Sequence, residues 1–245
     1  MPRIFIPLKE NPGTISITGE KARYLASVLR CTSGDALEIL DGKGRAYRAR
    51  ITSVNSKAVI AEVLGAVHHT TESPLNLVLI QGILKGEKMD LVVQKTTELG
   101  VREIIPAVTE RSQVRSTGKA ARWRKIAEDA SRQSGRTTIP QVREVIPFTD
   151  IFAPASPHFH GFRKARGILF REREGVAMKQ SAEALEGCRS LIIAVGPEGG
   201  FTCGEVEMAR AQGFLIVSLG LRILRAETAA ITAAAMAQML FGDMG

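Results

Sequence analysis

The chain has 245 residues, 44% of them hydrophobic, and its 33 lysines and arginines against 25 aspartates and glutamates give a net charge of +8. This length favours two modest domains, and the hydrophobic content suffices for a normal buried core. No apolar run approaches the ~20 residues of a membrane helix and no signal peptide is evident, so we expect a soluble protein. The three cysteines are scattered without C-x-x-C spacing, which argues against a disulfide framework or thiolate metal site and indicates a reducing cytoplasm.

The positive charge is unevenly distributed. Residues 111–143 contain nine basic and two acidic side chains. Residues 1–70 contain ten basic and six acidic side chains. Concentrated positive charge is what a phosphate backbone binds, so the pattern favours a nucleic-acid partner. A solvated helix face would have the same composition, and charge alone leaves that alternative open.

Residues 1–66 are predicted to form short strands around one helix. The expected strands are Arg3–Ile6, Ala36–Leu40, Ala46–Ile51 and Lys57–Leu64, and the helix is Glu20–Leu29. Asp41-Gly42 is a strong hairpin signal. After it, apolar residues alternate with Arg48 and Arg50, which predicts one buried and one basic face. The pattern indicates a small, mostly β barrel.

The polar stretch His68–Pro74 is a plausible linker, and beyond it strands and helices alternate. The predicted strands are Asn76–Ile83, Glu103–Val108, Gly167–Phe170, Ser190–Val195 and Phe214–Leu219, and the predicted helices are Glu87–Gly100, Lys119–Ser134 and Ala226–Phe241. The strands are nearly continuous apolar runs, as in a sheet that is covered on both faces. This order predicts an α/β domain with a largely parallel sheet.

The first candidate site follows the predicted strand Ser190–Val195. Its sequence is Gly196-Pro-Glu-Gly-Gly-Phe-Thr202, at the strand-to-helix edge where α/β sheets bind ligands. Its three glycines allow close approach of backbone to a ligand. Thr202 and Glu205 have capping-box spacing, so we expect a structural role for Glu205. A tight turn without a ligand would use the same glycines, and the local sequence does not decide between the two.

The second candidate site is Leu219–Ala229, which also leaves an apolar strand and enters a helix. Two arginines and a glutamate within six residues are unusual at a sheet edge. The alternative is a glutamate favoured by the helix dipole and arginines that reach solvent. We favour function because both segments are expected at the same edge. The alanines that follow fit core packing and a dimer interface equally well.

Several motifs are absent from the sequence. We find no G-x-G-x-x-G, Walker loop, H-E-x-x-H or G-x-S-x-G. The pairs His68-His69 and His158-Phe-His160 lack metal-ligand spacing and are expected on surface loops. Trp123, in the basic helix, is expected to be a packing anchor rather than a base-stacking platform.

Taken together, the motifs resemble the ribosomal RNA small-subunit methyltransferase E family of the SPOUT superfamily over nearly the whole chain. The matching segments, in order, are Met1-Pro-Arg-Ile-Phe-Ile6, Val28-Leu-Arg30, Asp41-Gly42, Lys85-Gly86, Gln94–Val101, Glu110-Arg-Ser112, Gln133-Ser-Gly-Arg136, Gly196–Gly200 and Leu219–Ala229. Each is weak alone, but nine in the right order are specific. One departure is Tyr24, where the family pattern has a histidine.

The resemblance implies a PUA-like β-barrel followed by a SPOUT (α/β-knot) domain whose C-terminal segment threads into a deep trefoil knot. We expect domains at residues 1–70 and 74–245. The resemblance also implies a homodimer with its active site near the subunit interface. The implied reaction uses S-adenosylmethionine to methylate N3 of uridine 1498 of 16S rRNA, with no metal and no membrane association.

The resemblance implies these roles for the two candidate segments. The cofactor is expected to contact Gly196, Pro197, Glu198, Gly199, Gly200, Leu219, Gly220, Leu221, Ile223 and Leu224, with apolar cover from Phe170. Because uridine N3 must lose a proton, Glu198 is the first candidate to accept it. Arg225, with Arg222 second, is expected to stabilise the negative charge that develops on the uracil oxygens.

RNA contacts are expected from both domains, and the partner is 16S rRNA in the assembled or assembling small ribosomal subunit. The candidate residues are Arg3, Arg23, Arg30, Arg48, Arg50, Arg111, Arg115 and Arg136. Such contacts position the RNA without specifying its sequence.

Three rival functions stay open. One is methylation of another base or of a ribose hydroxyl, which mass spectrometry of digested RNA would reveal. Another is a non-catalytic RNA-binding or assembly factor, which would have no intact cofactor pocket. The third is a nucleotide hydrolase, which would need a phosphate-binding lysine and a metal-binding hydroxyl that Gly196–Gly200 lacks.

Overall fold

The computed structural model describes residues 1–8, 13–55, 57–67, 71–153, 165–172 and 174–245. The four histidines considered above lie outside these ranges. Within the described chain, no helix is long and apolar enough to cross a membrane. The chain divides into two compact units, residues 1–72 with 131–139, and residues 73–130 with 140–245.

The first unit is built on a curled five-stranded sheet. Its elements are β1 (Arg3–Phe5), β2 (Thr14–Thr18), α1 (Gly19–Arg23), the π-helical turn η1 (Tyr24–Val28), β3 (Ala36–Leu40), β4 (Ala46–Val54) and β5 (Ala58–Val67). The strand order among the described residues is β1-β3-β4-β5-β2, with β1 and β3 parallel and the other pairs antiparallel. The predicted strands are therefore confirmed, and the sequence analysis missed β2.

The two faces of β4 differ as the alternation predicts. Tyr47, Ala49 and Ile51 are buried in the core of the unit, whereas Arg48 and Arg50 are exposed. The single helix expected over Glu20–Leu29 is instead divided. The Leu29 N–H donates to the Tyr24 carbonyl, five residues back, and this bond gives η1 its wider turn.

Residues 131–139 belong to the first unit through a buried ion pair. Arg136 donates to Glu72 at 2.8 Å, and the backbone N–H groups of Thr137 and Thr138 donate to the other oxygen of the same carboxylate at 2.9 Å. Both charged side chains are almost fully buried. Full pairing and hydrogen bonding offset the cost of burying these charges.

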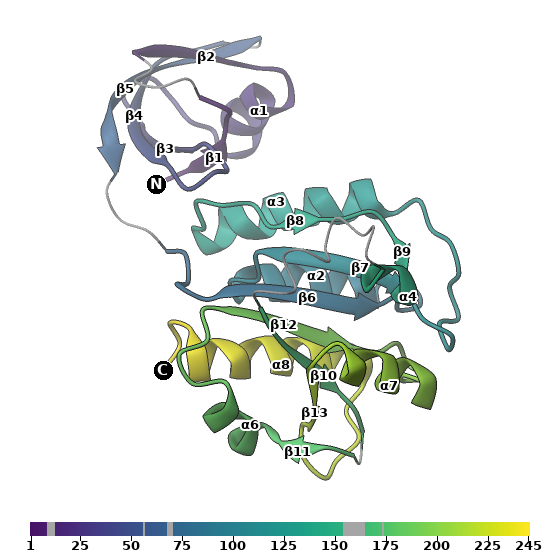
Figure 1. Cartoon of the computed structure of the whole chain (residues 1–245). Helices are drawn as coiled ribbons and strands as arrows, with labels where there is room; N and C mark the ends of the chain where they lie inside the picture. Colours follow the sequence, from purple (N-terminus) through teal and green to yellow (C-terminus); the bar gives the residue numbers. More distant parts are fainter. Residues whose placement is uncertain (9–12, 56, 68–70, 154–164, 173) are drawn as a thin grey trace. The chain divides into compact units, whose positions relative to one another are not determined.

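The second unit is an α/β domain. Its elements are β6 (Asn76–Gly82), α2 (Lys88–Glu98), β7 (Glu103–Val108), α3 (Ala120–Ser134, whose last residues lie in the first unit), β8 (Gln141–Val142), β9 (Ile146–Pro147), α4 (Phe148–Ile151), β10 (Arg166–Phe170), β11 (Val176–Ala177), α6 (Met178–Ala184), β12 (Ser190–Val195), α7 (Cys203–Ala211), β13 (Phe214–Ser218) and α8 (Ala226–Phe241). Figure 1 shows these elements in place.

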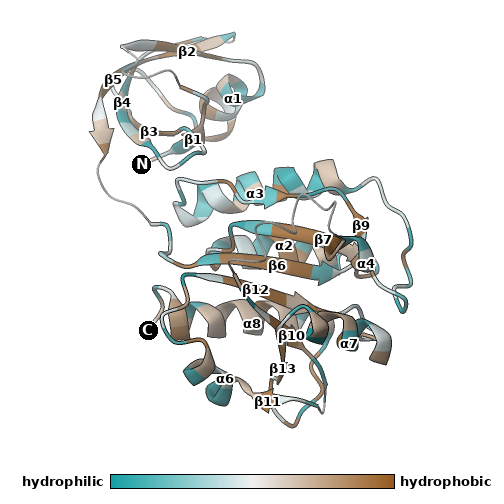
Figure 2. Ribbon diagram, in the orientation of Figure 1, coloured by the Kyte–Doolittle hydropathy of each residue, from teal (hydrophilic) through white to brown (hydrophobic). Residues whose placement is uncertain are grey.

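All strand pairs recorded in this sheet are parallel, as predicted, in the order β11-β13-β10-β12-β6-β7-β8, with β9 also paired to β7. The central strands β6, β7 and β12 are buried along nearly their whole length and stand out as apolar in Figure 2. One face packs on α4 and α7, and α8 contacts β6 and β12 as well as α2. Two covered faces explain why these strands read as continuous apolar runs.

Two structural roles expected from the sequence are confirmed. Trp123 is buried, and its ring N–H donates to Asp90 at 3.0 Å. In α8, the buried alanines include Ala230, Ala233 and Ala234, so core packing accounts for one side of this helix. Met239 and Leu240 are exposed on the same helix.

Candidate active site

Both candidate segments lie at the same edge of the parallel sheet. In the strand register, Phe170 of β10 pairs with Val195 of β12 on one side and with Val217 of β13 on the other. The three strands therefore end together. The chain leaves β12 into residues 196–202 and leaves β13 into residues 219–225. This juxtaposition is what the sequence analysis predicted, and it is the edge where open α/β sheets bind ligands.

Close backbone packing explains the glycines of the first loop. A Cβ at Gly199 would lie 2.9 Å from the Arg111 Cβ, and Gly200 has φ +67°. A Cβ at Gly82, where β6 ends, would lie 2.5 Å from the Pro197 ring and backbone nitrogen. Other residues would therefore displace the loop.

The capping box predicted at the start of α7 is confirmed. The Thr202 hydroxyl accepts from the Glu205 N–H, and a Glu205 oxygen accepts from the Thr202 N–H at 2.8 Å. The second oxygen of Glu205 accepts from the Glu110 N–H at 2.9 Å. Both oxygens of the buried Glu205 carboxylate therefore accept backbone hydrogen bonds, which fix the loop at the start of α7.

The two loops enclose one cavity of about 510 Å³. Its lining includes Lys88, Arg111, Phe170, Arg171, Glu172, Gly196, Pro197, Glu198, Gly199, Gly200, Phe201, Ser218, Leu219, Gly220, Arg222, Ile223, Leu224, Arg225 and Glu227. Every residue predicted to bind the cofactor is among them except Leu221. That side chain is fully exposed.

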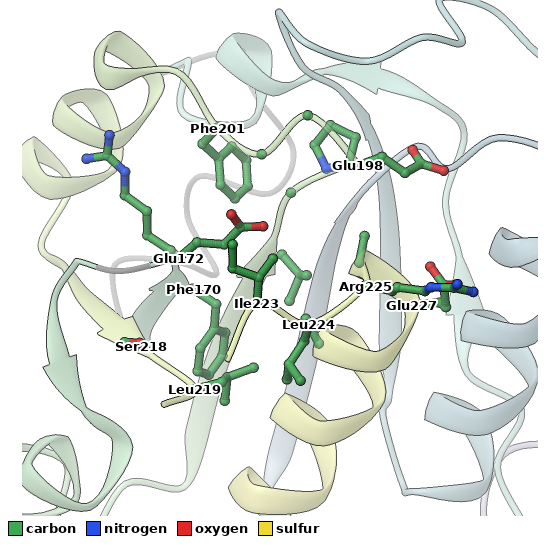
Figure 3. A pocket seen from close by; sticks show the side chains of 18 of the residues that line it. Phe170, Glu172, Glu198, Phe201, Ser218, Leu219, Ile223, Leu224, Arg225 and Glu227 are labelled. Atoms are coloured by element: carbon green, nitrogen blue, oxygen red, sulfur yellow. The ribbon is translucent and has the colours of Figure 1, made fainter. Parts of the chain in front are cut away.

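The cavity has an apolar part and a charged part. In Figure 3, Phe170, Leu219 and Leu224 lie on one side, and Glu198, Arg225 and Glu227 lie on the other. An apolar wall suits a planar ring, and convergent charged groups suit a polar or ionic part of a ligand.

Glu198 is held by an ion pair. Its Oε1 accepts from Lys88 Nζ at 2.9 Å and from the Lys85 N–H at 3.2 Å. Burial raises the pKa of the Glu198 carboxyl, but hydrogen bonds from Lys88 and from backbone N–H groups lower it, and the net pKa is below its ordinary value. This arrangement favours the ionised form and makes Glu198 a weaker base than an unpaired carboxylate.

Several cations line the cavity. Arg222 and Arg225, predicted from the sequence, both contribute, and Arg225 is the residue that precedes α8. Arg111 donates to the Gly199 carbonyl at 3.1 Å, so it contacts the first loop directly. The sequence analysis assigned Arg111 to RNA alone and did not identify Lys88 or Arg171. Neither of those two carries a local signal that distinguishes it from a surface charge.

Two acceptor atoms in this lining have no partner. Glu198 Oε2 and Glu227 Oε2 are buried and make no hydrogen bond within the described chain. Buried polar atoms of this kind are costly unless a ligand, ion or water supplies a donor. A ligand that carries positive charge or N–H groups fits such a cavity. No group of His, Cys, Asp and Glu among the described residues is arranged to hold a metal ion.

The arginines of the first unit that were predicted to contact RNA differ in their exposure to solvent. Arg23, Arg30, Arg48 and Arg50 are exposed, and Arg3 is partly exposed while it donates to Glu38 at 2.8 Å. Arg136 is buried in its ion pair with Glu72, so its guanidinium is not available to a phosphate. The structure therefore corrects the expectation for Arg136, whose positive charge is already neutralised inside the unit.

The departure at Tyr24 has a structural counterpart. The Arg132 guanidinium lies over the Tyr24 ring, 4.3 Å from its centroid. This cation–π contact joins η1 to the segment 131–139 within the first unit. The phenol ring of Tyr24 supplies the aromatic face on which the Arg132 guanidinium stacks.

Comparison with known proteins agrees with this geometry. Residues 71–238 match the family described as RNA methyltransferase domain, and residues 17–64 match the RNA methyltransferase PUA domain. The fold and the cavity therefore define an RNA methyltransferase. The chain belongs to the ribosomal RNA small subunit methyltransferase E family.

Individual relatives are similar over nearly their full length. The chain is 34% identical to the ribosomal RNA small subunit methyltransferase E of Bacillus subtilis, across 95% of this chain and 94% of the relative. The Buchnera aphidicola protein of the same name is 32% identical across 93% of this chain and 88% of its own length.

Solved structures share the fold. A ribosomal RNA small subunit methyltransferase E from Neisseria gonorrhoeae, bound to S-adenosyl methionine, has a TM-score of 0.90 and 34% identity, and each chain is fully covered. A Legionella pneumophila methyltransferase in complex with the cofactor SAM has a TM-score of 0.86 and 32% identity over 98% of both chains. The predicted fold class, a SPOUT α/β-knot domain with an N-terminal PUA-like domain, is confirmed.

Proposed function

We propose that the protein transfers a methyl group from S-adenosylmethionine to N3 of uridine 1498 of 16S rRNA. The observation that carries this proposal is the single cavity formed by the two glycine-containing loops in a chain of this family. When bound, S-adenosylmethionine supplies a methyl group activated by its sulfonium, and the sulfur leaves as a neutral thioether.

The cavity residues have complementary parts in cofactor binding. Phe170, Leu219 and Leu224 cover the adenine ring, and Gly196, Gly199 and Gly200 bring backbone groups into the cavity lining beside the ligand. Glu198, fixed by Lys88, adds negative charge that suits a cationic ligand. The Leu221 side chain is fully exposed and is not part of the cavity lining, so any contact it makes to the cofactor is through its backbone.

The arginines of the second loop act on the uracil. Deprotonated N3 shares its negative charge with the two uracil oxygens, and a fixed cation beside them lowers the free energy of the transition state. Arg225 is the first candidate for this role and Arg222 the second. Both line the cavity without a recorded carboxylate partner among the described residues.

The two parts of the chain divide the work. We assign RNA binding mainly to residues 1–70 through Arg3, Arg23 and Arg30, and catalysis to residues 74–245, where Arg111 adds a contact near the cavity. Residues 131–139 pack with the first part. The substrate is 16S rRNA within the small ribosomal subunit, and the protein acts in the cytoplasm without a metal. A homodimer would cover the exposed Met239 and Leu240 of α8.

The test is a deletion strain. Digested 16S rRNA from this strain should contain no N3-methyluridine when it is analysed by mass spectrometry. Incubation of small subunits from the strain with purified protein and S-adenosylmethionine should restore that nucleoside. If a different methylated nucleoside is missing instead, the protein methylates another base or a ribose hydroxyl. Failure to bind S-adenosylmethionine in calorimetry would favour a non-catalytic RNA-binding factor.

A further inference from the structure

Glu227 is the most deeply buried carboxylate in the cavity lining. It lies in the first turn of α8, its residue is 9% exposed, and its Oε2 is buried with no hydrogen-bond partner in the described chain. A buried acceptor without a donor destabilises a fold. Such a group needs an explanation beyond packing.

A capping role does not explain Glu227. Glu205, near the start of α7, shows what a structural carboxylate does at this sheet edge, because both of its oxygens accept backbone N–H groups. Glu227 has no recorded bond of this kind, and no side chain caps the start of α8. Charge–dipole attraction alone would be satisfied by an exposed side chain.

Glu198 is the other carboxylate on this side of the cavity, and its environment differs. Lys88 Nζ and the Lys85 N–H both donate to Glu198 Oε1. A carboxylate held in an ion pair binds a proton weakly. Two carboxylates in contrasting environments commonly have separate roles in a reaction. Here Glu198 has the paired environment and Glu227 the unpaired one.

We propose that Glu227, rather than Glu198, accepts the N3 proton of the target uridine. This inference rests on the proposed function. The N3–H bond breaks, the proton moves to Glu227 Oε2, and the electron pair left on N3 forms the new bond to the methyl carbon. The bond from that carbon to the sulfonium sulfur breaks at the same time, and its electron pair stays on the sulfur of the leaving thioether. The proton then passes from the carboxyl to solvent. Arg225, two residues before Glu227, supplies the positive charge that the ionised uracil requires.

The charged environment fits this role. The other charged residues that line the cavity come from α2, from the loop after β7 and from the loops after β10, β12 and β13; they are Lys88, Arg111, Arg171, Glu172, Glu198, Arg222 and Arg225. Cations outnumber carboxylates in this set, so the lining compensates the one negative charge that moves to the uracil oxygens as the proton is transferred.

The test compares Glu227→Gln with wild type on small subunits from the deletion strain. At saturating S-adenosylmethionine and RNA, turnover of the variant should fall about 10²-fold or more, as expected for loss of a general base. Glu183→Gln on α6, exposed and outside the cavity, is the matched control and should keep wild-type turnover. Turnover of Glu227→Gln within threefold of wild type would overturn the proposal.

Two measurements that do not depend on turnover separate this role from others. The Kd for S-adenosylmethionine should stay within threefold of wild type, because the role concerns the uracil. A tenfold weaker Kd with unchanged saturated turnover would instead mean a contact to the cofactor. The Tm should be equal or higher in Glu227→Gln, since Glu227 Oε2 has no hydrogen bond to lose. A clear loss of Tm would indicate a structural role and contradict the proposal.

The pH dependence gives an independent check. At alkaline pH the uridine N3 loses its proton to solvent, so Glu227→Gln should recover towards wild-type turnover as pH rises. A constant deficit at all pH values would contradict a role in proton removal. If wild type itself forms no N3-methyluridine, the proposed function fails, whereas a fully active Glu227→Gln beside an active wild type refutes this inference alone.

Discussion

At the scale of single residues, Arg225 carries the electrostatic part of the proposed reaction. We expect Arg225→Ala to lower kcat about 10²–10³-fold while the Kd for S-adenosylmethionine changes little, because the cation acts on charge that develops only in the transition state. Single-turnover methylation of small subunits measures this effect. Arg166→Ala, at the opposite end of β10 from Phe170, is the control. A loss confined to cofactor binding would contradict the role.

The Glu198–Lys88 pair predicts a pH-dependent stability. Because the folded-state pKa of Glu198 is below its ordinary value, the pair stabilises the fold above the unfolded pKa of about 4.3, and this contribution is lost as pH falls through the folded pKa. Wild type should therefore exceed Glu198→Gln in Tm at pH 6–7, and the difference should shrink below about pH 4. A constant difference from pH 3 to 7 would contradict this assignment.

The sequence identified some of these side chains and not others, for physical reasons. Glu198 is next to Gly199, and Arg225 lies in the segment that joins β13 to α8, so both were predicted to lie in the site. Glu227 was noted beside the two arginines of the second segment but was given no role, because carboxylates are common at helix starts and only its missing hydrogen bonds distinguish it. Arg136 was misassigned because its partner, Glu72, is 64 residues away in the sequence.

At the scale of elements, the end of β6 supports the first loop. In Gly82→Ala the new Cβ would lie 2.5 Å from Pro197, so either β6 or the loop must shift. We expect a loss of about 1–3 kcal/mol in the free energy of unfolding, together with weaker binding of S-adenosylmethionine. Denaturant unfolding and calorimetry measure the two effects. Gly118→Ala, with no atom within 4 Å, should change neither.

Long buried elements were predictable, and short ones were not. The bounds of β7, β12 and α8 agree with the sequence analysis because each has a long apolar or helical pattern. The two-residue strands β8, β9 and β11 and the four-residue α4 are too short for a periodic signal. The three strands form because neighbouring strands offer backbone groups to pair with, and no local sequence pattern records this. The knotted path likewise came from the family resemblance alone.

At the scale of the whole molecule, RNA affinity and cofactor affinity should be separable. Arg48→Ala with Arg50→Ala, on the exposed face of β4, should weaken binding to small subunits and leave the Kd for S-adenosylmethionine unchanged. The slope of log affinity against log salt should fall by about 0.7–0.9 for each phosphate that the variant no longer neutralises. Filter binding at several salt concentrations measures it, with exposed Arg189→Ala as the control. Equal loss of both affinities would contradict the division of labour.

The inclusion of residues 131–139 in the first unit has a consequence for biosynthesis. The partner of Glu72 emerges from the ribosome only after residues 73–130 have been translated. The amino-terminal barrel is therefore the first part to be made but cannot complete its own packing until more than half of the chain exists. A polypeptide that stops before residue 136 would lack the counter-charge of Glu72 and part of the packing of this unit.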